Sequence, residues 1–156
     1  MAHIQKRGWK YLIRIKDHNT YSSSILHGFE LPSTKEFDVD INLKLTRKQT
    51  NGVKELIKDK NHYRQIAHNK PFDYLSEKSK KSDPTIMYSL PFRIVRFSIT
   101  EDTYEVVVTD FDREIFPSQT LKELYSMRWG IETSFRDLKY TIGLLHFHSK
   151  KVEFIL

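Results

Sequence analysis

The chain has 156 residues, of which 38% are hydrophobic and 13% aromatic, so it can bury a core and is not a disordered polymer. Lysine and arginine outnumber aspartate and glutamate by 26 to 20, and the resulting net charge of +6 suits a polyanionic partner. The absence of cysteine excludes disulfides and thiolate chemistry, and no apolar run reaches the roughly 18 residues of a membrane helix, so a cytoplasmic protein is expected.

The first two thirds of the chain are predicted to be rich in β-strands. Residues 9–16 combine β-branched and aromatic side chains, which indicates a strand. Residues 37–45 alternate apolar and polar side chains, so a half-buried strand is expected with Asp38 and Asp40 on its solvent face. Two further strands, at 90–99 and 103–109, are predicted to form an antiparallel hairpin. Residues 46–83 show little clear period, and 78–84 resemble a solvated loop.

A long helix is the last predicted element. Ser118 is the expected N-cap, no proline occurs between residues 119 and 142, and Gly143 is a natural stop. At about 100° per residue, one side of this helix is apolar and is predicted to be buried. The residues of this side are Leu124, Ile131, Phe135, Leu138 and Ile142.

Four polar or aromatic side chains form a stripe along the margin of that apolar side. Tyr125, Arg128, Glu132 and Lys139 fall within about 60° of one another on an ideal helix, where they can line a cleft. A carboxylate between two cations could bind Mg²⁺ while the cations hold phosphate. The alternative is a surface salt-bridge ladder, because Arg128 and Glu132 also have ordinary i,i+4 spacing.

The spacing of these four residues matches a known signature. It is the Y-(2)-R-(3)-E-(6)-K pattern, set within LYSMRWGIETSFRDLK at residues 124–139 and followed by 143–150. In these positions, and more loosely at 11–14, the chain resembles bacterial DDE transposases of the insertion-sequence-four group. Such a resemblance implies an α+β fold with a partial RNase H-like core. It implies a core strand in residues 1–20, a mainly β insertion in 21–115, and the catalytic glutamate helix with a C-terminal core segment in 116–156.

The resemblance also implies roles for single residues. Glu132 would be the third carboxylate of the DDE triad, which binds Mg²⁺ for cleavage and transfer of transposon-end DNA. DNA contacts are expected from five residues: Tyr125, Arg128, Lys139, Lys150 and Lys151. Packing of the helix onto the core sheet is expected from Trp129, Ile131 and Phe135.

The chain departs from the family pattern at its beginning. No acidic residue precedes Asp17, which follows the first strand instead of leading into it, so neither aspartate of the triad is assigned. The sequence is therefore expected to be a C-terminal fragment that is inactive alone and prone to self-association through unpaired strand edges. Two alternatives stay open: a regulatory fragment that binds DNA or full-length transposase without catalysis, and a small basic protein whose helix matches by accident.

Other acidic and imidazole side chains are also candidates for functional groups. His146 and His148 are two residues apart, but no third metal ligand lies near them in the sequence, so surface or DNA-proximal positions are favoured. Asp110 and Asp112 follow a strand and are predicted to serve the turn that leads to the helix.

Overall fold

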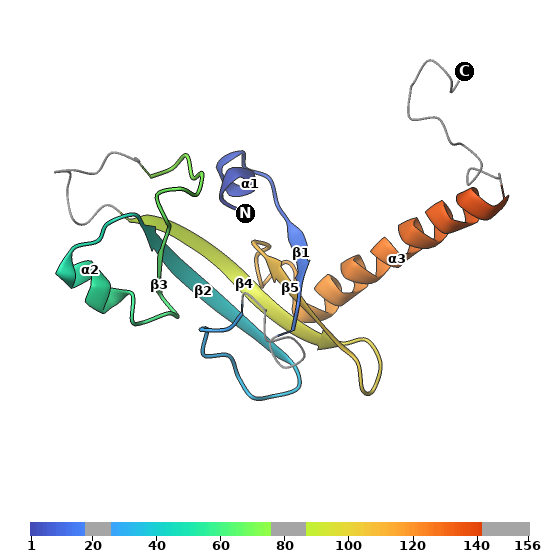
Figure 1. Cartoon of the computed structure of the whole chain (residues 1–156). Helices are drawn as coiled ribbons and strands as arrows, with labels where there is room; N and C mark the ends of the chain where they lie inside the picture. Colours follow the sequence, from blue (N-terminus) through green and yellow to red (C-terminus); the bar gives the residue numbers. More distant parts are fainter. Residues whose placement is uncertain (18–25, 76–86, 142–156) are drawn as a thin grey trace, which may run out of the picture. The chain divides into compact units, whose positions relative to one another are not determined.

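The computed structural model describes residues 1–17, 26–75 and 87–141, and the chain divides into two compact units, 1–115 and 116–156. The first unit holds a sheet with short helices, and the described part of the second is one long helix (Figure 1). None of the helices in these ranges is long and apolar enough to cross a membrane. The elements in chain order are α1 (Ala2–Lys6), β1 (Leu12–Ile15), β2 (Phe37–Thr46), α2 (Asn51–Leu56), β3 (Tyr63–Gln65), β4 (Tyr88–Ser98), β5 (Tyr104–Thr109) and α3 (Ser118–Thr141).

The sheet of the first unit is mixed, with strand order β1-β5-β4-β2-β3. All neighbouring strands are antiparallel except β2 and β3, which run parallel. The long strand β4 is the centre of the sheet, between β5 and the long strand β2, and the short strands β1 and β3 are its edges (Figure 1). Together with the helices, this sheet makes the chain a mixed α/β protein.

The predicted hairpin is confirmed. Strands β4 and β5 pair from Ser98↔Tyr104 back to Arg93↔Thr109. Their turn is closed by a hydrogen bond from the Ile99 amide to the Thr103 carbonyl, at 2.8 Å. Because local turn chemistry and β-rich flanks specify such a hairpin, the sequence was sufficient to find it.

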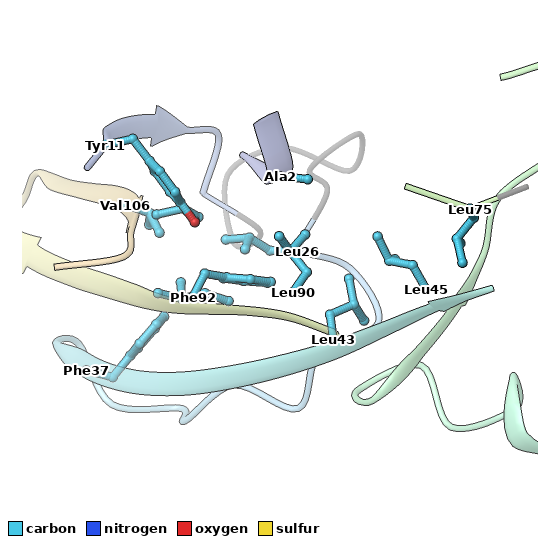
Figure 2. Close-up of a cluster of buried hydrophobic side chains, with 12 residues drawn as sticks. Ala2, Tyr11, Leu26, Phe37, Leu43, Leu45, Leu75, Leu90, Phe92 and Val106 are labelled. Atoms are coloured by element: carbon cyan, nitrogen blue, oxygen red, sulfur yellow. The ribbon is translucent and has the colours of Figure 1, made fainter. Parts of the chain in front are cut away.

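The alternating pattern of β2 also predicted its burial. Phe37, Leu43 and Leu45 are buried, whereas Asp40, Asn42 and Lys44 are exposed. The buried side chains form a hydrophobic core with residues of β4 and β5, and Figure 2 shows Leu26 beside Leu90 and Leu43 there. Removal of this apolar surface from water is the main force that holds the sheet together.

The prediction for Asp38 was wrong. Its carboxylate is largely buried and accepts hydrogen bonds from Arg93, at 3.1 Å from Nε and 2.5 Å from Nη2. Asp40, two residues further along β2, is exposed as predicted and pairs with Arg113 at 2.7 Å. Sequence alternation assigned both carboxylates to one face, but it could not reveal that a buried guanidinium covers part of that face.

Strand β1 starts three residues later than the segment predicted at 9–16, because helix α1 and its cap precede it. Gly8 has the positive φ of 69° that ends helices favourably, and its amide donates to the Gln5 carbonyl at 2.9 Å. The Trp9 amide donates to the Ile4 carbonyl at 3.1 Å. These two bonds make a Schellman motif, which fixes the backbone of Trp9 before β1 begins.

Elements α2 and β3 lie in the region where no period was detected. Helix α2 begins after Thr50, whose hydroxyl accepts from the Val53 amide at 3.4 Å. Strand β3 is formed by parallel pairing with β2, in which Tyr63 lies opposite Lys44. Both elements are too short for a recognisable hydrophobic period. The predicted loop at 78–84 lies outside the described residues.

Helix α3 confirms the predicted long helix, with two corrections. The Leu121 amide bonds to the Pro117 carbonyl at 3.1 Å, so the N-cap is Pro117 and Ser118 is already helical. The prediction of a buried apolar side was wrong for Ile131, Phe135 and Leu138, which are 59%, 62% and 40% exposed. The exposed side chains lie in the later turns of α3, whereas Leu121 and Tyr125 in its first turns are buried.

Candidate nucleic-acid interface on helix α3

The predicted stripe lies on one unbroken stretch of helix. Arg128 Nη2 is 3.0 Å from Glu132 Oε1, and both side chains are about half exposed. The Arg128 guanidinium also lies over the ring of Tyr125, 5.4 Å from its centroid. Lys139 is exposed on the same side of the helix, about two turns after Glu132. The structure therefore joins Tyr125, Arg128 and Glu132 by contact and leaves Lys139 facing solvent on the same helix.

Burial separates Tyr125 from the other three residues. Its side chain is only 3% exposed, and Leu121 one turn earlier is fully buried. In this conformation the Tyr125 ring packs against Arg128 instead of facing solvent, so its direct effect is to hold that guanidinium. Arg128, Glu132 and Lys139 are the members of the stripe that are exposed to solvent.

The Arg128–Glu132 pair is weak enough to exchange partners. An exposed i,i+4 ion pair contributes roughly 0.3–0.5 kcal/mol, because water screens the charges and both side chains lose rotamer freedom. A phosphate or a divalent cation can therefore separate the pair at small cost.

Several other predicted residues lie outside the described residues, namely His146, His148, Lys150 and Lys151. Asp112 confirms its predicted role in the turn before α3, whereas Asp110 contacts the backbone just before β1 instead. Asp110 Oδ1 accepts from the Tyr11 amide at 3.0 Å, and Asp112 Oδ1 accepts from the Glu114 amide at 2.8 Å. Both carboxylates therefore hold backbone amides in place.

Residues 1–17, 26–75 and 87–141 contain no group of three histidine, cysteine, aspartate or glutamate residues placed to hold a metal ion. Asp17 is buried and pairs with Arg96 at 2.9 Å, which gives this carboxylate a structural partner within the sheet. Glu132 has carboxylate oxygens, which Mg²⁺ prefers, but a two-metal site needs ligands from more than one carboxylate. The described residues alone thus do not complete a Mg²⁺ site.

Comparison with known protein families tests the resemblance to DDE transposases. A family model described as "Transposase DDE domain" matches residues 1–155, nearly the whole chain. The chain belongs to this family of DDE transposases. No curated protein and no solved structure matches the chain. An accidental resemblance of the helix alone is excluded, because the match to the DDE transposase domain also spans the sheet of the first unit.

One surface of this DDE transposase domain was not predicted from the sequence. A groove of about 870 Å³ in the first unit is lined by Trp9, Lys10, Asn42, Arg93 and other residues. Trp9 is 60% exposed, and the Arg7 guanidinium lies 5.4 Å from its ring centroid. The sequence feature that could have drawn attention to this surface is the run Lys6-Arg7-Gly8-Trp9-Lys10, in which cations flank an aromatic residue.

Proposed function

We propose that this chain serves DNA transposition as a transposase of the insertion-sequence-four group, with α3 as the helix that presents the catalytic glutamate to transposon-end DNA. The proposal rests on one observation. The residues of the Y-(2)-R-(3)-E-(6)-K signature lie on a single unbroken helix of a chain whose sequence matches the DDE domain over residues 1–155. DNA cleavage and strand transfer are the reactions of the complete enzyme.

The proposal includes an assignment of the chain to the parts of an RNase H-like transposase. Residues 1–20 carry a strand of that core, 21–115 the mainly β insertion, and 116–156 the glutamate helix with a C-terminal core segment. The compact-unit boundary between residues 115 and 116 supports the second division. Strand β1 pairs with β5, so the proposed core strand and insertion share one sheet in this structure.

DNA binding is assigned to the cations of the stripe. Arg128 and Lys139 are exposed on either side of Glu132 along the helix, so phosphates can approach both. Arg128 is further held by the ring of the buried Tyr125, which reduces the rotamer freedom that phosphate binding must restrict. Lys150 and Lys151 extend the same basic character toward the end of the chain.

The role proposed for Glu132 is that of one Mg²⁺ ligand. DDE transposases generally depend on Mg²⁺, which in such enzymes activates the attacking oxygen and stabilises the leaving oxygen. Glu132 is the one carboxylate assigned, and one carboxylate does not hold two Mg²⁺ ions. We therefore propose that the chain binds DNA but does not cleave it by itself, because it supplies one of the three triad carboxylates.

The binding experiment compares single charge removals on α3. Fluorescence anisotropy is measured with a labelled duplex that carries the terminal repeat of the encoding element, and with a random duplex. Arg128→Gln and Lys139→Gln are each expected to weaken binding and to reduce the salt slope by about 1, the effect of losing one phosphate contact. Lys122→Gln is the control, because it removes the same charge from another side of the helix.

Equal affinities for all three variants would contradict the assignment of phosphate contacts to the stripe. Incubation of the chain alone with Mg²⁺ and the terminal-repeat duplex is expected to leave both strands intact. Nicking that disappears in Glu132→Gln would instead show that this chain completes its own metal site.

A further inference from the structure

We infer that the segment from Lys44 to Lys70, which we call the basic lobe, binds the sugar–phosphate backbone of DNA without regard to base sequence. The lobe comprises the end of β2, helix α2, strand β3 and the residues that follow it, at the edge of the sheet where β3 pairs with β2 (Figure 1). This inference rests on the proposed function, since it takes DNA as the partner. It adds a second contact surface, which belongs to the first unit, whereas the stripe belongs to the second.

The positive charge of the whole chain is concentrated in the basic lobe. The lobe contains eight of the 26 lysine and arginine residues but only two of the 20 aspartate and glutamate residues. Its net charge therefore equals the +6 of the whole chain, and the rest of the sequence is neutral overall. A local surplus of this kind creates a positive potential that attracts a polyanion more strongly than the same charge spread over the entire surface.

Both acidic side chains of the basic lobe are already paired within it. Glu55 Oε2 lies 2.6 Å from the Lys58 ammonium, and Asp59 Oδ2 lies 2.9 Å from His62 Nδ1. Within the ranges that the structure describes, three exposed lysines of the lobe form no ion pair, namely Lys54, Lys60 and Lys70. Their ammonium groups can therefore meet phosphate without first leaving a carboxylate.

The backbone that carries these lysines is held in place. Arg47 is only 2% exposed, and its guanidinium donates to the Ala67 carbonyl at 2.9 Å and to the Lys70 carbonyl at 2.8 Å. The Lys44 amide donates to the His62 carbonyl at 2.7 Å, which joins β2 to the turn before β3. Because the backbone is already ordered, DNA binding restricts mainly the lysine side chains, and this lowers the entropic cost of binding.

The exposed side chains of the basic lobe suit phosphate contacts. Lysine carries a compact ammonium with three donors on a flexible stem, and it binds phosphate as a point charge. Exposed side-chain amides add donors of the kind that also hydrogen-bond phosphate oxygens, namely Gln49, Asn51 and Asn69. Because every nucleotide carries a phosphate, such contacts carry no sequence information. The lobe should therefore add equal affinity for terminal-repeat DNA and for random DNA.

The test compares the removal of three charges inside the basic lobe with the removal of three charges outside it. The lobe variant of the full chain combines Lys54→Gln, Lys60→Gln and Lys70→Gln. The control variant combines Lys10→Gln, Lys16→Gln and Lys35→Gln, which are exposed residues of the same unit. Both variants have the same net charge, so they differ only in where the charge was removed. Circular-dichroism melts check that both fold like the parent.

Binding of a random duplex and of a terminal-repeat duplex is measured by fluorescence anisotropy between about 50 and 200 mM salt. Each lost phosphate contact should reduce the salt slope by about 0.9, so loss of all three should reduce it by about 2.7. Over this range of salt, the parent should then lose about 40-fold more affinity than the lobe variant does. The control variant should keep a slope close to that of the parent.

Equal salt slopes for the lobe variant and the control variant would overturn the inference. A loss of affinity confined to the terminal-repeat duplex would also overturn it, because backbone contacts do not distinguish sequences. Loss of affinity for an RNA duplex of equal length, with DNA binding unchanged, would overturn the assignment to DNA. If the lobe variant binds DNA like the parent while Arg128→Gln still weakens binding, the inference fails and the proposed function stands. Failure of the parent to bind either DNA would overturn both.

Discussion

Truncation of Asp38 should destabilise the first unit far more than truncation of Asp40, although both carboxylates lie on strand β2 two residues apart. Asp38 receives two hydrogen bonds from Arg93, whose side chain is 5% exposed. Asp40 has an exposed side chain (62%) and pairs with Arg113. Truncation of Asp38 thus removes a carboxylate from the buried cation of Arg93, whereas truncation of Asp40 removes one from the more exposed cation of Arg113.

The expected magnitudes follow from burial. Removal of one partner from a buried ion pair costs about 3–5 kcal/mol, because the remaining charge stays desolvated without compensation. Loss of an exposed pair costs only about 0.2–1 kcal/mol. Asp38→Ala should therefore lower the free energy of unfolding by at least about 2 kcal/mol more than Asp40→Ala. With a urea slope of about 1–3 kcal/mol per molar, the midpoint should fall by roughly 1 M or more in Asp38→Ala.

The assay must report on the first unit alone. Amide hydrogen exchange of peptides from β2 and β4, measured against urea by mass spectrometry, satisfies this need because both are interior strands of its sheet. Arg93→Met combined with Asp38→Ala should recover much of the loss, since no unpaired charge then remains buried. Equal destabilisation by Asp38→Ala and Asp40→Ala would refute the reasoning from burial.

Two further predictions concern residues near the start of the first unit. Burial, followed by the charge of Asp110, raises the pKa of the Tyr11 phenol in the folded state, so the unfolded chain loses this proton first. The stability contributed by Tyr11 is therefore complete below about pH 10 and falls as the pH rises above it. In urea unfolding measured from about pH 8 to 11, Tyr11→Phe should remove the fall of the midpoint with pH that Tyr11 causes. Gly8→Ala should cost about 1 kcal/mol, because φ is +69° there, and thermal unfolding should show it; a neutral result would mean that α1 frays without loss of stability.

The regular elements that the sequence predicted are those with a strong local pattern. The 90–109 hairpin and the long helix were found with small errors at their ends, because β-rich runs, turn residues and the absence of proline act within a few residues. Helices α1 and α2 and strand β3 were missed. Strand β3 has only three residues and gains its structure from pairing with β2, which no local pattern records.

In the candidate site too, the sequence predicted what depends on local spacing and missed what depends on tertiary contacts. Spacing alone placed Arg128, Glu132 and Lys139 on one side of α3, and the unbroken helix agrees. Spacing did not predict that Tyr125 would be buried or that Phe135 would be exposed. Amphipathic periodicity tells which side of a helix can be covered, whereas burial depends on the presence of a second surface.

The sequence by itself determined the transposase signature, the helix that carries it and the hairpin of the sheet, since each depends on residues close together in the chain. Tertiary structure decided that Asp38 meets Arg93 across two strands, and that Trp9 lies exposed beside a groove. Those arrangements join residues far apart in sequence, up to about a hundred positions in the case of Trp9 and Asp110. Their free energies depend on desolvation and contact, which exist only once the chain has folded.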